Sequence, residues 1–169
     1  MVDRSVEAWK SWKDAQLKYD YYIVGLVAAL FAYVGSSYIP QKIAFSQNTF
    51  ELTSIIFLAV SLIVGIKRLE IDLQLQTITL KQCEASDLKK VANTIIAHGG
   101  SKNGDTGGEI TVSEASEKAE LLQSSLKKLN EIFIEKSKVG EWLFKIRNWA
   151  LSLGFITYAA SKIVGVYNI

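Results

Sequence analysis

Three long apolar stretches constrain this chain more than any other feature of its sequence. Residues 21–39 hold no charged side chain, and a helix over them would reach about 28 Å, close to the hydrocarbon thickness of a bilayer. A second stretch, charged only at Glu51, covers 50–66, and a third covers 148–169. We therefore predict an all-α integral membrane protein with three transmembrane helices.

Two of these stretches leave an alternative open. The run 52–66 is short enough for a buried helix of a soluble protein, but the neighbouring run 21–39 favours a membrane hairpin. The third stretch contains Lys162, which lies near its end, so that the amine can reach the far headgroups. A re-entrant or surface-lying helix would also suit this lysine. We expect 148–169 to be the third span.

The distribution of lysine and arginine predicts the orientation of the spans. Basic residues gather before the first span, after the second and before the third, whereas the loop between the first two spans has only Lys42. Cytoplasmic loops carry the excess of positive charge. The N-terminus and residues 67–147 are therefore expected in the cytoplasm, and the short loop and the C-terminus outside.

The first twenty residues favour an interfacial amphipathic helix. Val6, Trp9 and Trp12 follow helical spacing, with charged residues between them. Such a helix is either a plain anchor for the first span or a collar that responds to lipid. We predict that residues 1–20 form this separate element.

Residues 67–147 indicate a cytoplasmic helical hairpin with a flexible, glycine-rich loop at 98–110. Ile71, Leu73 and Leu75 alternate with polar residues as in a strand, but an isolated strand would have no partner. A helix, broken near the N-cap residue Ser86, is the favoured interpretation.

The second arm of the hairpin begins with a capping box formed by Thr111 and Glu114. Apolar residues then recur at steps of three and four, as in a coiled-coil seam: Leu122, Leu126, Leu129 and Phe133. This seam either packs on the first arm or meets copies of itself.

Small residues line one face of the first and third spans. Close packing of helices in lipid depends on such residues. They are Gly25, Ala29 and Ala32 in the first span, and Ala150, Gly154, Ser161 and Gly165 in the third. The two faces serve either the internal bundle or self-association, and a homo-oligomer is expected.

Charged residues mark where the second and third spans meet the cytoplasm: Lys67, Arg68, Glu70 and Arg147. Arg68 and Glu70 are placed to pair with the segment 141–147 and so hold the bundle together. Alternatively, Arg68 anchors lipid headgroups, as basic residues at cytoplasmic span ends commonly do.

The sequence contains no set of residues typical of catalysis or cofactor binding. Cys83 and His98 are the only residues of their kinds and lack ligand partners at metal spacing. The tripeptide 105–107 reads Asp-Thr-Gly, but an aspartic protease needs a preceding apolar strand and a second aspartate. We predict a protein that is not an enzyme and that binds no cofactor or metal. The net charge of +2 argues against nucleic acid as a partner.

The layout is similar to that of small multi-span bacterial membrane proteins with an aromatic-rich N-terminal helix, a tight hairpin of spans and a Lys-Arg-x-Glu exit. The stretches IVGIKRLE at 63–70 and LSLGFITYAASKI at 151–163 carry this resemblance. The layout also resembles the two-span SLATT effector domains of bacterial conflict systems, which are proposed to form pores when a partner senses infection. A third span departs from that two-span plan.

This resemblance implies a bacterial inner (cytoplasmic) membrane protein that serves as a defence effector. Because no catalytic set of residues is present, we expect it to act with no chemistry of its own. We expect a self-assembling effector or channel-like component gated through its cytoplasmic hairpin. The alternative is a membrane scaffold or regulatory subunit whose hairpin docks a cytoplasmic protein. In both cases the lipid bilayer is a partner.

Overall fold

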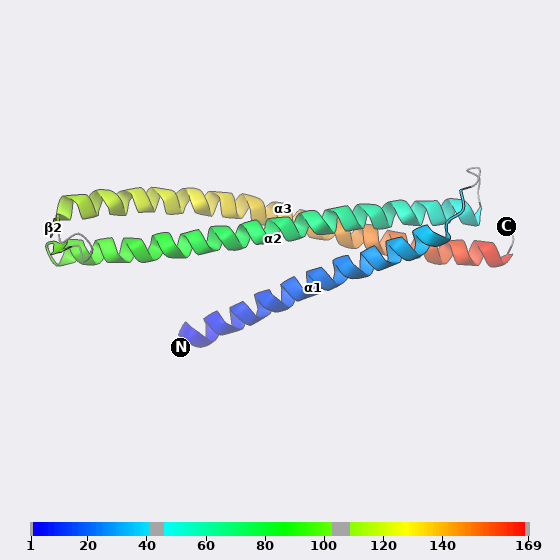
Figure 1. The fold of residues 1–169 in the computed structure, drawn as a ribbon, viewed down its shortest axis with the longest axis horizontal. Helices are drawn as coiled ribbons and strands as arrows, with labels where there is room; N and C mark the ends of the chain where they lie inside the picture. Colours follow the sequence, from blue (N-terminus) through cyan, green and yellow to red (C-terminus); the bar gives the residue numbers. More distant parts are fainter. Residues whose placement is uncertain (1, 41–45, 103–108, 168–169) are drawn as a thin grey trace. The chain divides into compact units, whose positions relative to one another are not determined.

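The computed structural model describes residues 2–40, 46–102 and 109–167 of the chain. Its helices are α1 (Val2–Ser37), α2 (Gln47–Ala97) and α3 (Val112–Tyr167) (Figure 1). All three are long and apolar enough to cross a membrane. The chain is therefore all-helical in character, as predicted, apart from a two-residue antiparallel pair, β1 (Ser101–Lys102) with β2 (Glu109–Ile110), inside the expected loop.

Helix α1 differs from the expected division of the N-terminal region. A separate interfacial helix over 1–20 requires a change of direction before the first span. Instead, α1 is a single helix from Val2 to Ser37. It ends just before Pro40, which has no amide hydrogen to continue the helical hydrogen bonds.

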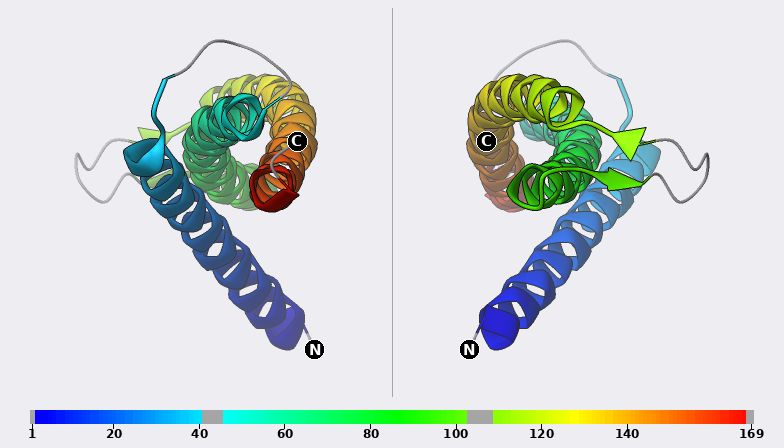
Figure 2. Two further views of the ribbon diagram at one scale, coloured as in Figure 1. Left: turned by 90° about the vertical axis from the view of Figure 1, so that its right-hand side faces the viewer. Right: turned by 90° about the vertical axis from the view of Figure 1, so that its left-hand side faces the viewer.

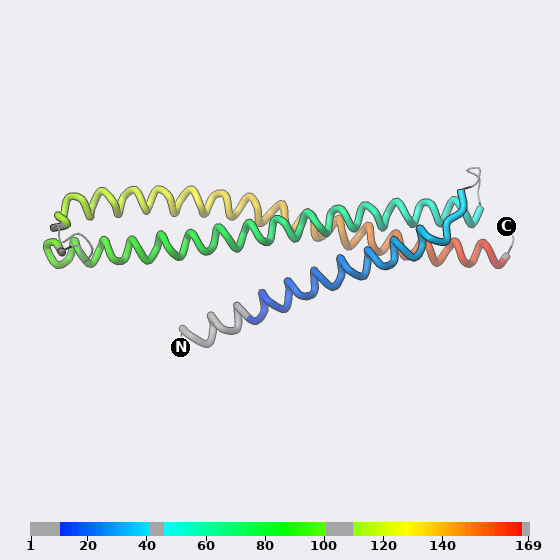
Figure 3. Tube along the Cα trace, in the orientation of Figure 1, coloured from blue at the N-terminus to red at the C-terminus, as the bar shows by residue number. Residues whose placement is uncertain are grey.

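Helices α2 and α3 are also uninterrupted, as the tube in Figure 3 shows. The predicted break near Ser86 is wrong, because α2 continues through it to Ala97. The strand alternative for residues 71–75 is wrong for the same reason. Helix α3 likewise passes through Gly140, where the sequence permits a bend, with no interruption.

The chain divides into two compact units. The first contains the apolar spans and comprises Met1–Ile71 with Gly140–Ile169, and the second is the hairpin Asp72–Val139. In the first unit the buried core is formed by Val27 and Val34 of α1 with Leu58 of α2. Figure 2 shows α2 and α3 nearly along their axes, with α1 seen obliquely. Partly buried residues from all three helices surround this core: Ile23, Leu30, Phe31, Ile55, Leu62, Leu151 and Tyr158.

The hairpin unit is held by small buried side chains and by the predicted seam. Its buried apolar residues are alanines from both arms: Ala85, Ala92, Ala115 and Ala119. All four seam residues, Leu122, Leu126, Leu129 and Phe133, are half-buried. The capping box is confirmed, since the Glu114 carboxylate accepts from the Thr111 amide at 3.0 Å, and the Glu114 amide donates to the Thr111 hydroxyl at 3.3 Å.

Candidate functional site

The most unusual feature of the span unit is a buried cluster of Asp20, Arg68 and Arg147, one residue from each helix. The Arg68 Nη2 and Asp20 Oδ2 atoms lie 2.9 Å apart, and Arg147 Nη1 donates to Asp20 Oδ1 at 2.7 Å. Asp20 and Arg147 are fully buried, and Arg68 is 5% exposed. A single carboxylate therefore joins α1 to both other helices.

The Asp20 cluster is completed by groups that orient its arginines. The Phe144 ring lies under both guanidinium groups, with its centroid 4.2 Å from Arg68 Cζ and 5.2 Å from Arg147 Cζ. Arg147 Nε also donates to Asn148 Oδ1 at 3.2 Å. Such aromatic contacts favour a cation where little water is present. Both arginines thus share the Phe144 ring, and Asn148 gives Arg147 one further hydrogen bond, while the buried Arg147 Nη2 makes none within the described part of the chain.

Gly65 of α2 makes room for this arrangement. A Cβ atom at this position would lie 2.8 Å from Val24 Cγ2 of α1 and 3.3 Å from Arg147 Cδ of α3. Any larger residue would therefore displace one of its neighbours. Gly65 allows the three helices to approach closely just beside the Asp20 cluster.

Two serines of α2 tie this helix to the backbone of α3. The Ser54 hydroxyl donates to the Gly154 carbonyl at 2.8 Å, and the Ser61 hydroxyl donates to the Arg147 carbonyl at 3.0 Å. Both serines are buried. They lie two turns apart on α2, as their acceptors do on α3, so the same antiparallel register is maintained along the contact.

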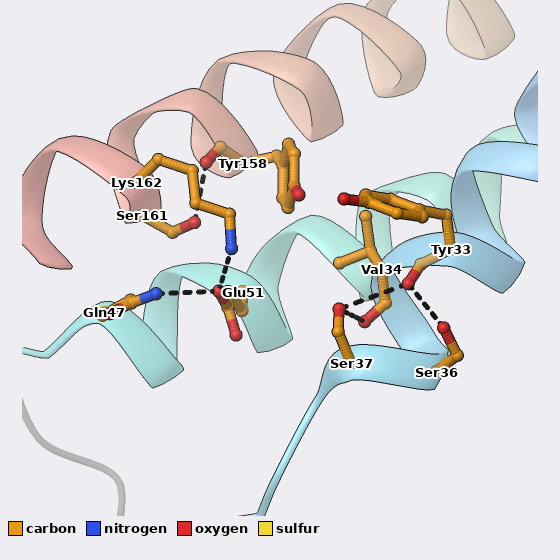
Figure 4. A network of polar contacts seen from close by, with 9 residues as sticks. All are labelled: Tyr33, Val34, Ser36, Ser37, Gln47, Glu51, Tyr158, Ser161 and Lys162. Carbon is orange, nitrogen blue, oxygen red and sulfur yellow. Dashed lines mark hydrogen bonds and ion pairs between the residues drawn. The ribbon is translucent and has the colours of Figure 1, made fainter.

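A second ionic contact closes the other end of the spans (Figure 4). Lys162 Nζ donates to Glu51 Oε1 at 2.8 Å, and Gln47 Nε2 donates to the same oxygen at 3.1 Å. The ammonium also lies 4.9 Å from the centroid of the Tyr158 ring. Lys162, which interrupts the third apolar stretch, is therefore compensated by a carboxylate of α2.

The Asp20 cluster and the Glu51–Lys162 pair are separated by a length suited to a membrane. From Glu51 to Arg68 along α2 is about 25 Å, and from Arg147 to Lys162 along α3 is about 22 Å. Between them, the one charged residue on α2 is Lys67, directly beside Arg68, and α3 carries none. Large apolar side chains of this section face outward, among them Ile56, Ile63, Phe155 and Ile156. The outer surface is thus apolar, and the charges are confined to the two ends.

Arg68 and Glu70 were expected to meet the segment 141–147, and Arg68 does contact Phe144 of that segment. Arg68 and Arg147 both also pair with Asp20. Glu70 forms an exposed ion pair with Lys67 at 2.8 Å. The sequence reasoning missed Asp20, although an acidic residue directly before a charge-free span is a recognisable signal.

The two small-residue faces have different surroundings. Ala150, Gly154 and Ser161 of α3 are buried, and Gly165 approaches the Gln47 side chain, so this face packs within the bundle. Gly25, Ala29 and Ala32 of α1 are exposed instead. No atom lies within 4 Å of a Cβ built at Gly25.

The hairpin unit has an open groove of about 440 Å³ between its arms, lined partly by Cys83, Asp87 and Lys90. Asp87 and Lys90 form an exposed ion pair at 2.8 Å, and hydrogen bonding to the carboxylate raises the pKa of the Lys90 ammonium. Within the described ranges, no group of three or more His, Cys, Asp or Glu side chains is arranged to hold a metal ion.

Comparisons of this chain with protein-family models, with curated proteins and with solved structures gave no match.

Proposed function

We propose that the protein is a self-assembling, channel-like effector of a bacterial inner membrane, gated through its cytoplasmic hairpin. Its N-terminus lies in the cytoplasm and its C-terminus outside. The proposal begins with the span unit, whose apolar outer surface and charged ends suit a bilayer hydrocarbon core of about 30 Å. The Asp20 cluster would lie at the cytoplasmic interface and the Glu51–Lys162 pair at the outer one.

The outward face of α1 is the single observation that carries self-assembly. Lipid provides no hydrophobic drive between helices, so their association depends on close packing at small residues. The small residues of α3 are already used inside the bundle, whereas Gly25, Ala29 and Ala32 are exposed. This face is free to receive a helix of a second copy at short distance.

Gating through the hairpin is supported by the continuity of the helices. Both α2 and α3 enter the hairpin unit from the span unit with no break. A ligand or partner that moves the hairpin arms would therefore move the second and third spans as well. No chemistry is required for such a response.

The alternative function, a scaffold that docks a cytoplasmic protein, is favoured by a different surface. Leu73, Leu80, Leu88 and Val91 follow helical spacing on α2, and each is more than half exposed. An apolar stripe of this kind on a cytoplasmic helix is a common docking surface for a partner.

The test combines mass measurement and ion flux. We expect the purified protein to be oligomeric in detergent and to pass potassium ions when reconstituted in liposomes. Gly25→Leu with Ala29→Leu should reduce the mass to one copy and abolish the flux. The matched control is Ala159→Leu, at an exposed small residue of α3, which should change neither.

A wild-type protein that is monomeric at every concentration would refute self-assembly through α1. If no ions pass under any condition while a cytoplasmic protein co-purifies, the scaffold function should replace the effector.

A further inference from the structure

The contacts of α1 with the other two spans differ in kind from those between α2 and α3. Helices α2 and α3 share the buried hydrogen bonds of Ser54 and Ser61 and the Glu51–Lys162 pair, which are spread along the whole contact. They also pack closely at Gly154, where a Cβ would lie 3.1 Å from Leu58 Cγ. The α2–α3 pair is therefore fixed at both ends and in the middle.

Helix α1 is fixed to this pair chiefly at one end. Asp20 gives it short ion pairs with both α2 and α3. Farther along, α1 meets the pair through the apolar side chains Val27 and Val34 and through an edge-to-face contact of Tyr33 with Tyr158, centroids 6.5 Å apart. In lipid, the apolar contacts of Val27 and Val34 are exchanged for contacts with acyl chains at little cost.

We infer that α1 is the mobile helix of the bundle and that the Asp20 carboxylate is the latch that holds it closed. When Asp20 leaves Arg68 and Arg147, α1 separates from the intact α2–α3 pair. The role of this movement rests on the proposed function, since an effector must open. That Asp20 holds α1 against the other two helices is argued from the contacts alone. The sequence suggested that the contact holding the bundle lies at the exit of α2. The inference places this contact at Asp20, directly before the first apolar stretch.

The position of the latch also explains how the hairpin would operate it. Arg68 and Arg147 belong to the two helices that continue into the hairpin. A small relative shift of these helices would separate the two guanidinium groups, and one carboxylate could then no longer meet both. Asp20 would then lose one of its two arginine partners while it remained buried. A buried charge that loses its partner is strongly destabilising. Helix α1 would move to relieve it.

The test measures the position of α1 directly. In a Cys83→Ser background, spin labels at the exposed positions Tyr22 and Ile156 report the α1–α3 distance, and labels at Ile63 and Ile156 report α2–α3. Asp20→Asn should lengthen the first distance by roughly 10 Å, about the diameter of a helix, and leave the second unchanged. Asp14→Asn, at an exposed aspartate of the same helix, should change neither. An unchanged α1–α3 distance in Asp20→Asn would overturn the inference.

Cysteine tethers test the latch without removing Asp20. The pair Tyr33→Cys and Tyr158→Cys, joined by a short bis-methanethiosulfonate, would fasten α1 to α3 away from the Asp20 cluster. Leu58→Cys with Gly154→Cys, joined in the same way, would fasten α2 to α3. The first tether should abolish ion flux and the second should preserve it, and reduction should restore the flux lost with the first.

Flux that persists with α1 tethered would contradict the latch. If no form of the protein conducts, wild type included, the proposed function fails, and the distance measurement still decides whether Asp20 holds α1.

Discussion

The substitution Gly65→Ala adds one methyl group at the point where the three spans are closest. Its Cβ would meet Val24 Cγ2 at 2.8 Å and Arg147 Cδ at 3.3 Å. Arg147 cannot move away freely, because its guanidinium group donates to the buried Asp20 at 2.7 Å. Overpacking of this kind costs about 1–3 kcal/mol, and displacement of Arg147 from Asp20 would add to it.

Replacing glycine by alanine inside a helix also has a favourable effect, of about 1 kcal/mol. The overpacking cost less this gain is about 0–2 kcal/mol, and the displacement of Arg147 from Asp20 adds to the expected loss in the free energy of unfolding. The measurement is reversible unfolding in mixed detergent–dodecyl sulfate micelles, followed by tryptophan fluorescence and by helical circular dichroism.

The matched control is Gly35→Ala, on the same bundle. A Cβ at Gly35 has no neighbour within 4 Å, so we expect this variant to be as stable as the wild type or more stable. Equal stabilities for Gly65→Ala and Gly35→Ala would refute the close approach of helices at Gly65, and with it the geometry of the Asp20 cluster.

Two further predictions concern the ends of α3. Hydrogen bonds from the Thr111 backbone and side chain lower the pKa of Glu114 below its ordinary value of 4.5. Their contribution to stability is therefore complete above pH 4.5 and is lost as the pH falls through the lowered pKa. The difference in melting temperature between wild type and Glu114→Ala should therefore shrink below pH 4.5; a difference that does not depend on pH would contradict the capping box. At the other end, Lys162→Met leaves the carboxylate of Glu51 without its lysine, and we expect a loss of about 1 kcal/mol, since Lys162 is half exposed. The double variant with Glu51→Gln should recover most of it in the same unfolding assay, and a purely additive result would refute the coupling.

The features that sequence alone could predict are those that depend on neighbouring residues. Long apolar runs identify the three helices that are long and apolar enough to cross a membrane. The Thr111–Glu114 capping box marks the start of α3 because its partners are three residues apart. The half-buried seam follows from helical periodicity in the same way.

The Asp20 cluster could not be predicted in this way, because Asp20 and Arg147 are 127 residues apart and meet only when three helices pack together. Periodicity also gave the same small-residue pattern for the first and third spans. It could not indicate which of the two would face inward, since that depends on how the three helices are rotated when they pack together.

The predicted breaks fail for a related reason. Ser86 is a good N-cap residue in isolation, but it lies on the side of α2 that lines the groove facing α3, and the helix continues through it. Local capping preference is worth about 1 kcal/mol, which packing along a long helix exceeds.

Cysteine accessibility can show whether the span unit crosses a membrane with the hairpin in the cytoplasm. The native Cys83 is exposed in the hairpin unit, and Ser46→Cys in a Cys83→Ser background places a thiol in the short loop before α2. A membrane-impermeant maleimide is added to intact bacterial spheroplasts that express each protein. We expect residue 46 to react at once and Cys83 to react only after the membrane is permeabilised. Labelling of Cys83 in intact spheroplasts would contradict both the orientation and the cytoplasmic gate.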